Sequence, residues 1–513
     1  MQKGSRDDRL SALPDDILVN ILDRLNVPEA ARTSILARRW GQLCAKLSRL
    51  IISVQDFLPE GVLHTNVSVE ELVRTNAAVV QATESILARR NPGEHTIRLL
   101  STTFYLRDDA PLSIGRAVGH VMATHLVEVA KFTVRTGKDD IAEIDDDELI
   151  TCARKFMVFF DACSNAFGGL TSLDLENLRF GESDISSILV SCKQLKHLHL
   201  YNCDCGEHST LQVDHAHLSE LCIVQCLLSH VKLSWLPQLT QLVFDGWIDY
   251  DDPLFIGHVP LLKAVSLTNV ALSSNKMFKL SEFLSSTSVQ NLKLGFKSEK
   301  VCQDCRFVSR GFTSSPLISS CVFSLQIWVQ PECPTQSLAS VFRQLRFVNL
   351  VNIPEGYDLT WTMFILEAAP LLKDLYITVW DHACSMEMDE EKRKKELYSE
   401  DKGVEWDEAA ADFQHRSLVT LVICGFESED CFVNYVRRVM TAAVNLEDVF
   451  LYSRLDCDNC KDEKKIRFPW TKRQRISLKK RITVGIESFA IIHSSKMVRD
   501  DHQAKILYPE CSR

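Results

Sequence analysis

The 513-residue sequence is notable first for what it does not contain. No run approaches the roughly 18 consecutive apolar residues of a membrane-spanning helix. Its first residues, MQKGSRDDRLSALPDD, include no apolar segment of the kind found in secretory signal peptides. We therefore expect the protein in the cytoplasm or nucleus, with no membrane partner. In those compartments the 18 cysteines are expected to be reduced thiols.

An excess of basic residues is also missing. Lys and Arg total 58 against 68 Asp and Glu, a net charge of −10 that disfavours a nucleic-acid partner. Residues 51–460 hold 35 basic and 56 acidic groups, whereas residues 461–513 hold 14 and 6. An acidic body with a basic tail suggests either separate interaction surfaces or ordinary solvated charge. The basic clusters at 472–475 and 479–481 are compatible either with a nuclear localisation signal or with a solvated tail.

Sequence signatures of catalysis are missing too. There is no GxSxG, no P-loop, no HExxH and no dinucleotide-binding GxGxxG after a strand. The cysteines and histidines stand in no recognisable nucleophile setting. We therefore expect no catalytic residue and no cofactor, and a protein that is not itself an enzyme.

Three clusters of possible metal ligands have simpler explanations. Two CxxC pairs, at residues 302–305 and 457–460, have the spacing of zinc ligands but lie about 150 residues apart, which favours thiols in turns. The acidic run 145–148 stands where a helix is expected to begin, and acids cap that end. His197 and His199 share one face of a predicted strand, as part of an exposed surface. No metal site is predicted.

Short helices are expected in the first fifty residues. Pro14 suits the first turn of a helix, and the acids after it suit the positive helix end. Apolar residues follow at helical spacing in two stripes: Ile17, Leu18, Ile21, Leu22 and Leu25, then Leu36, Trp40, Leu43 and Leu47. So small a module cannot bury both sides of all these side chains. Part of the apolar surface should therefore contact another protein or domain.

This segment resembles the F-box, in the form common in plants. The resemblance rests on LPDDIL at residues 13–18 and RTSILARRW at residues 32–40, with one departure at Cys44, where a Trp is usual. It implies docking on the Skp-type adaptor of an SCF ubiquitin ligase, and through it on a cullin–RING ligase. By position, the residues that would supply the apolar contact are Leu13, Pro14, Ile17, Leu18, Ile21, Leu22, Ile35, Leu36 and Trp40.

The body of the sequence repeats the template L-x-x-L-x-L. Eleven matches begin at residues 170, 195, 218, 239, 262, 289, 322, 345, 372, 418 and 446. The early period lies within the 20–29 residues of leucine-rich repeats. Each repeat should contribute a strand whose fourth and sixth positions enter the core, while the ninth position, held by Cys203 and Cys226 among others, turns the chain. Weaker opening repeats are expected before residue 170, with strands at 97–106 and 128–135 and helices at 114–126 and 146–163.

The C-terminal region carries a second resemblance. Residues 412–490, read as strand, Gly-Phe turn, helix and strand, resemble the FBD domain that closes many plant F-box proteins. The predicted fold class is α/β: a three-helix F-box followed by an irregular leucine-rich-repeat solenoid that an FBD region caps. The predicted segments are the F-box at 6–50, a helical linker at 51–95, repeats at 96–380, a charged loop at 381–411, the FBD domain at 412–490 and a tail at 491–513.

These features predict a substrate-recognition subunit of an SCF-type ubiquitin ligase. The alternative is a non-ligase interaction scaffold, or a decayed receptor whose F-box no longer docks. Because a strand alternates faces, the residues between the core leucines should line a concave surface that captures an unknown target protein. They are Asp174, Glu176, His197, His199, Tyr201, Gln241, Asp245, Lys293, Gln326, Trp328, Asn349, Asp374 and Tyr376.

Overall fold

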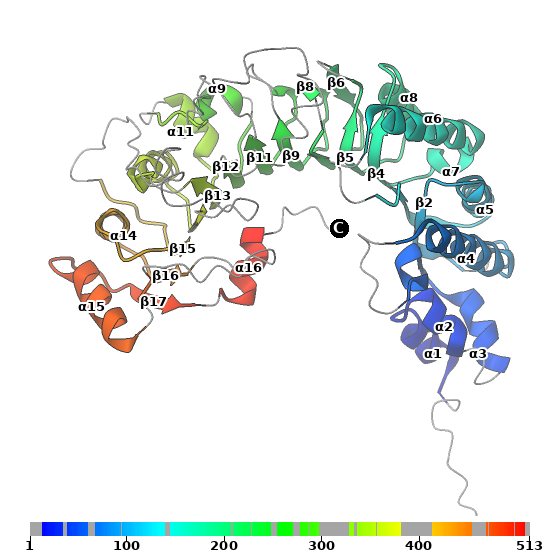
Figure 1. Cartoon of the computed structure of the whole chain (residues 1–513), viewed down its shortest axis with the longest axis horizontal. Helices are drawn as coiled ribbons and strands as arrows, with labels where there is room; N and C mark the ends of the chain where they lie inside the picture. Colours follow the sequence, from blue (N-terminus) through cyan, green and yellow to red (C-terminus); the bar gives the residue numbers. More distant parts are fainter. Residues whose placement is uncertain are drawn as a thin grey trace, which may run out of the picture. The chain divides into compact units, whose positions relative to one another are not determined.

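The structure is a computed structural model in which parallel strands alternate mainly with helices (Figure 1). By contacts, the chain divides into two compact units, residues 1–206 with 215–218 and residues 207–214 with 219–513. The described residues are 13–33, 38–59, 67–93, 95–138, 144–206, 209–226, 228–247, 254–269, 278–285, 287–296, 328–332, 336–354, 357–380, 413–453, 468–469, 471–496 and 498–507.

Unit 1 begins with short helices that share a small core. They are α1 (Asp15–Leu22), α2 (Val27–Thr33) and α3 (Arg38–Leu43), followed by the 3-10 turn η1 (Cys44–Lys46). Leu18, Leu22 and Trp40 are buried together with Leu43 and Leu47. The Asp15 carboxylate accepts hydrogen bonds from Arg39 Nε at 2.9 Å and Lys46 Nζ at 3.2 Å. These bonds from two cations lower the pKa of Asp15.

The sheet of unit 1 is parallel and is covered by helices on one face. Its strands pair in chain order: β1 (Arg49–Ser53), β2 (Ile97–Tyr105), β3 (Val127–Arg135), β4 (Ser172–Arg179) and β5 (His197–Asp204). The helices of this unit are α4 (Val69–Ala88), α5 (Ala110–Thr124), α6 (Asp146–Ala162), α7 (Ser164–Gly168) and α8 (Asp184–Ser191). The expected strands and helices of the opening repeats are thus confirmed. The segment 51–95 is not helical throughout, because it starts inside β1, which pairs with β2.

Buried aromatic rings fill the space between this sheet and its helices. Phe104 and Phe132 on the strands meet Phe159 and Phe167 on the helices, with ring centroids 5.0 to 5.9 Å apart. Ring pairs in this geometry stabilise the folded state beyond what the burial of their apolar area contributes. Asp145 caps α6, because its Oδ1 accepts the backbone N–H of Glu148 at 2.8 Å. The helix-cap interpretation of the acidic run is therefore confirmed.

Unit 2 continues the same architecture. Its main sheet is parallel throughout, in the order β7 (Glu220–Val224), β9 (Gln241–Trp247), β11 (Ala264–Asn269), β12 (Asn291–Phe296), β13 (Phe347–Pro354), β14 (Asp374–Trp380), β15 (Thr420–Cys424), β16 (Asp448–Tyr452) and β17 (Ile491–Ser495). A small second sheet pairs β10 (Leu254–His258), β8 (Leu228–Trp235) and β6 (Ser209–Asp214).

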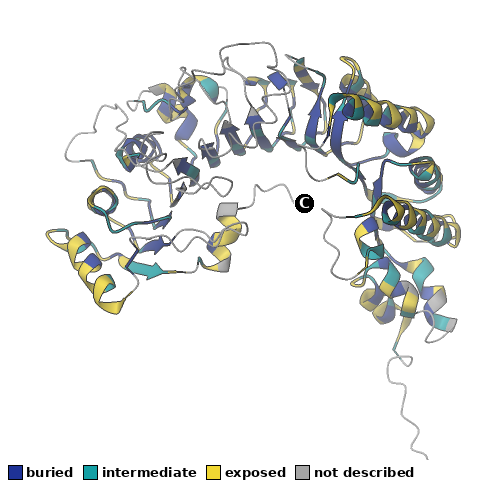
Figure 2. Ribbon diagram, in the orientation of Figure 1, coloured by how far each residue is buried: buried dark blue, intermediate teal, exposed yellow. Residues whose placement is uncertain are grey.

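Neighbouring repeats stay in register through their core positions. Position four of the template aligns from strand to strand, as in Leu292 with Val348 and Leu375 with Leu421, and these side chains are fully buried. The helices are α9 (Leu280–Phe283), α11 (Gln336–Phe342), α12 (Met363–Ala368) after the 3-10 turn η7 (Leu359–Thr362), α14 (Asp430–Ala442), α15 (Lys472–Thr483) and α16 (Asp500–Leu507). Figure 2 shows buried strands beside the largely exposed α15.

Strands β12 and β13 pair directly, and the repeat template expected at 322–327 lies outside the described residues. One expectation for this unit is wrong. The tail at 491–513 is not merely a tail, since it supplies β17, which pairs with β16, and α16. The charged segment 381–411 and both CxxC pairs lie outside the described residues.

In the repeats that begin at residues 170, 195, 345 and 418, the turn that ends the strand lies at template position eight, not nine. There the backbone is left-handed at Asn177, Asn202 and Asn352, with φ between 49° and 59°, and Gly425 has φ 79°. Asn and Gly tolerate this region better than other residues. Position nine is instead a buried core position, with Cys203 and its equivalents Cys226, Ile353 and Phe426 each at most 1% exposed.

Candidate functional site

An apolar stripe on α1 is the first candidate surface. Ile17 is 44% exposed, Ile21 is 37% exposed, and Leu25, just after the helix, is 37% exposed. Ile17 and Ile21, four residues apart, lie along one side of α1, and Leu25 follows at the same spacing in the turn after the helix. Leu18 and Leu22 lie on the other side and are fully buried. We call Ile17, Ile21 and Leu25 the α1 stripe.

The structure divides the nine residues predicted to bind the adaptor. Leu18, Leu22 and Trp40 are core residues that support the stripe from within. Pro14 is exposed beside Ile17 and Ile21, and Leu13 is half-buried. Ile35 and Leu36 lie outside the described residues. Leu25 is absent from the predicted set, although its spacing from Ile21 was a signal for it.

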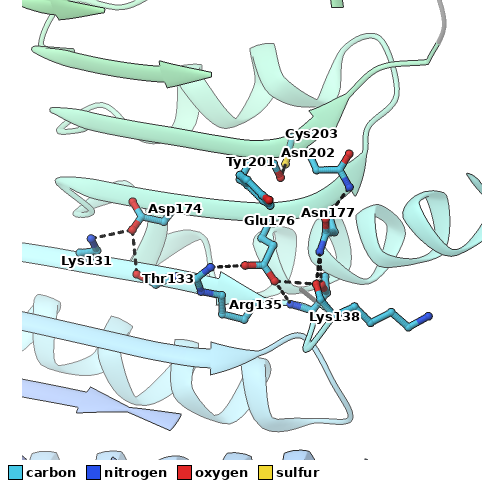
Figure 3. Close-up of polar contacts among 11 residues, drawn as sticks. Lys131, Thr133, Arg135, Lys138, Asp174, Glu176, Asn177, Tyr201, Asn202 and Cys203 are labelled. Carbon is cyan, nitrogen blue, oxygen red and sulfur yellow. Dashed lines mark hydrogen bonds and ion pairs between the residues drawn. The ribbon is translucent and has the colours of Figure 1, made fainter. Parts of the chain in front are cut away.

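The second candidate surface is the sheet face opposite the covering helices, which we call the open face. In unit 1 it carries ion pairs between β3 and β4 (Figure 3). Lys131 Nζ lies 2.8 Å from Asp174 Oδ2, and Arg135 pairs with Glu176. Asn177 donates to Thr136 Oγ1 at 2.8 Å and accepts from Asn202 at 2.6 Å. The in-register parallel strands bring these side chains together, so Asp174 and Glu176 are engaged within the protein rather than free to meet a target.

The next strand of unit 1 presents the predicted histidines. His197 is exposed, while His199 and Tyr201 are half-buried on the same face of β5. Among the residues that the structure describes, no three His, Cys, Asp or Glu side chains gather in a way that could hold a metal ion. Burial raises the pKa of the Cys192 and Cys424 thiols to about 12. Both therefore stay protonated near neutral pH and supply no nucleophile.

In unit 2 the open face is partly covered. Gln241 and Lys293 line a cavity of about 240 Å³ whose far side is formed by Ala504 and Lys505 of α16. Asp245 and Asp374, also predicted to meet a target, are half-buried on their strands. Gln326 lies outside the described residues.

Three predicted contact residues in unit 2 are buried, contrary to the expectation that they are exposed. Trp328 is 4% exposed: its Nε1–H donates to the Gly295 carbonyl at 2.9 Å, and its ring packs on Phe296. Trp328 is buried because its neighbour Val329 pairs with Phe278 in an isolated bridge, so this part of the chain does not join the main sheet. Asn349 and Tyr376 are buried because α16 lies over them.

Family comparisons match these parts of the chain. The F-box domain matches residues 10–52. The LRR repeats of FBD-associated F-box protein At5g56370 match residues 148–281, and the LRR domain of At1g61320/AtMIF1 matches residues 253–493. The chain thus combines an F-box domain with leucine-rich repeats. The region predicted as FBD lies within the last of these LRR matches, and its assignment to that domain stays a prediction.

Relatives whose names include an F-box occur in Arabidopsis thaliana. F-box/FBD/LRR-repeat protein At3g52680 is 25% identical over 42% of this chain and 45% of its own length. FBD-associated F-box protein At1g60410 is 45% identical over 10% of this chain and 13% of its own. FBD-associated F-box protein At5g18780 is 40% identical over 11% and 12%. The chain spans 11% to 45% of the length of the first curated relatives it matches.

Within the described residues, no helix is long and apolar enough to cross a membrane.

Proposed function

We propose that this protein is the substrate-recognition subunit of an SCF-type ubiquitin ligase in the cytoplasm or nucleus. Its F-box contacts a Skp-type adaptor and thereby a cullin–RING ligase, and its repeats hold a target protein. Other subunits carry out ubiquitin transfer, so the chain needs no catalytic residue of its own. Its contribution is proximity, because tethering raises the effective concentration of the target beside the transfer machinery.

The observation that carries this proposal is the α1 stripe. Apolar side chains lie exposed along one side of α1, inside the region that matches the F-box domain, while Leu18 and Leu22 hold the helix on its core. Large apolar side chains exposed in a row mark an interaction site more often than scattered ones do. The anchored helix presents the stripe in a fixed arrangement, which limits the entropy lost on binding.

Introducing negative charge into the α1 stripe tests adaptor docking. In Ile17→Asp/Ile21→Asp, two carboxylates would be buried at an apolar interface, so we expect adaptor affinity to fall by at least about tenfold. The measurement is co-purification of a Skp-type adaptor with the full-length chain. Val158→Asp/Val190→Asp is the matched control, because it places the same charges on exposed apolar positions of α6 and α8.

The control variant should retain the adaptor, and both variants should keep the wild-type melting temperature. Undiminished co-purification with Ile17→Asp/Ile21→Asp would contradict the ligase proposal. That outcome would support the alternative, an interaction scaffold that works without the adaptor.

A further inference from the structure

The C-terminal helix α16 occupies part of the open face of unit 2. It lies on the opposite side of the strands from α14 (Figure 1). Beneath it, β13, β14 and β16 present Phe347, Tyr376, Phe450 and Tyr452, which we call the aromatic face. Tyr376, Phe450 and Tyr452 form one buried cluster, with Phe347 packed against it.

One side chain of α16 inserts into this face. The His502 ring is 5% exposed and lies edge-on to Phe450 and Tyr376, with centroid distances of 4.5 and 5.6 Å. Its Nδ1 is 2.8 Å from the Tyr452 hydroxyl. Burial lowers the pKa of His502, which favours the neutral ring, and the ring forms a hydrogen bond with the Tyr452 hydroxyl. The aromatic face therefore contains a slot for a ring that forms a hydrogen bond with Tyr452.

Two cations flank this slot. Arg499 Cζ lies 5.5 Å from the Phe450 centroid, and Lys505 Nζ lies 5.5 Å from that of Tyr376 and 5.9 Å from that of Phe347. The electron-rich faces of aromatic rings attract such cations. Asp374 and Asp448 are half-buried on the same strands and add negative charge. The face thus favours a helix that carries one ring and adjacent basic residues.

Helix α16 contacts the sheet through one side only. The helix has eight residues, and Asp501, Gln503, Ala504 and Lys505 are exposed. Its backbone is fixed to the sheet at Lys505, whose carbonyl accepts from Asn349 Nδ2 at 2.9 Å. So short a helix is marginal by itself, and its order depends on the contacts with the aromatic face. A second helix with the same side chains would compete for the same positions.

We propose that the aromatic face is a helix-binding site for the target, and that α16 occupies it in cis until a target helix replaces it. The partner segment is a short amphipathic helix with a His or aromatic residue followed three residues later by Lys or Arg, the spacing of His502 and Lys505. This inference deepens the target-capture half of the proposed function and rests on it. Its test needs no adaptor, so its failure is distinguishable from failure of adaptor docking.

The exchange is tested with the full-length chain and a fluorescent peptide of residues 496–507, by fluorescence anisotropy. His502→Ala/Lys505→Ala weakens α16 in cis without changing a strand, so this variant should bind the peptide at least about tenfold more tightly than wild type does. Gln503→Ala, on the exposed side of α16, is the control and should behave as wild type. Adding Tyr452→Phe to the weakened chain keeps the ring and removes the hydroxyl, and should lower peptide affinity several-fold.

Equal peptide binding by the wild-type and weakened chains would overturn the proposal. A second measurement needs no variant: amide hydrogen exchange in α16 of the wild-type chain should accelerate at saturating peptide, and unchanged exchange would contradict displacement. To identify the class of partner, the His502→Ala/Lys505→Ala variant is used to select binders from a displayed library of short helices. The proposal is supported if the selected helices carry a His or aromatic residue followed three residues later by Lys or Arg, and if the 496–507 peptide displaces them. Enrichment of helices without that pair, or ones that the peptide does not displace, contradicts it.

Discussion

Two histidines show how single residues tie one repeat to the preceding one. His215 and His415 stand three residues before the first leucine of their templates, Leu218 and Leu418. His415 Nε2 lies 2.9 Å from the Ala369 carbonyl, and its Nδ1 accepts the backbone N–H of Leu418 at 3.0 Å. His215 makes similar contacts: its Nε2 lies 3.0 Å from the Cys192 carbonyl, and its Nδ1 accepts the backbone N–H of His217 at 3.2 Å, as His415 Nδ1 accepts that of Ser417 at 3.3 Å. Each ring thus satisfies buried backbone groups on both sides of a turn.

Replacing His415 tests this role. His415→Ala removes one of the two hydrogen bonds to the Ala369 carbonyl, which keeps the Leu372 N–H, and removes the acceptor of the Leu418 N–H, so we expect the free energy of unfolding to fall by about 1–3 kcal/mol. The measurement is denaturant unfolding of the full-length chain. Gln414→Ala, at the exposed neighbouring position, is the control and should change it by less than about 0.5 kcal/mol. An effect of His415→Ala no larger than that of the control would contradict the role.

The same residue predicts a pH dependence. Burial lowers the pKa of His415 below its usual 6.5, although the hydrogen bond to Ala369 opposes this. The unfolded chain then binds a proton more readily than the folded chain does. The stability that His415 contributes is therefore complete above pH 6.5 and is lost as pH falls through the lowered pKa. Between pH 7.5 and 5.5 the wild-type melting temperature should fall more steeply than that of His415→Ala; parallel slopes would contradict this.

At the scale of the element, several repeat strands end at a position whose backbone is left-handed. Gly425 fills this position after β15, with φ 79°, and a Cβ there would overlap the Val379 carbonyl of the neighbouring β14. Gly485, after α15, has φ 73°, but a Cβ there would meet nothing within 4 Å. The two glycines share the backbone strain and differ in the close approach.

Alanine substitutions separate these two effects. Gly485→Ala should cost about 1–2 kcal/mol of unfolding free energy from the left-handed backbone alone. Gly425→Ala adds a steric overlap with a neighbouring strand, and should cost about 2–5 kcal/mol. Thermal unfolding of both variants gives the comparison. Equal losses would show that strand spacing at the turn is not constrained as described.

At the scale of the whole molecule, the sequence predicts what is periodic. The recurring leucines identified the parallel strands, and the F-box motifs identified the N-terminal module, because both patterns repeat a local rule. Trp328, β17 and α16 escaped prediction because their places depend on distant partners: Phe278 for the first, the edge of β16 for the second and the aromatic face for the third. Alternation correctly put Tyr376 opposite the core, but no local pattern showed that α16 covers it.

The same distinction applies to the docking surface. Helical spacing grouped the apolar residues of α1 into a stripe. It did not show which of them face outward, because that depends on the position of α3. Trp40 and Leu43 of α3 are buried in the same core as Leu18 and Leu22. Ile17, Ile21 and Leu25 are left as the outward side. We therefore expect adaptor binding on this side of α1 alone.

Hydrogen–deuterium exchange of the full-length chain, with and without a saturating Skp-type adaptor, tests this central claim most directly. We predict slower exchange in peptides that cover residues 13–25 and unchanged exchange across β13 to β17, since we propose separate surfaces for adaptor docking and target capture. Protection across β13 to β17 with none in residues 13–25, or no protection anywhere, would contradict the account.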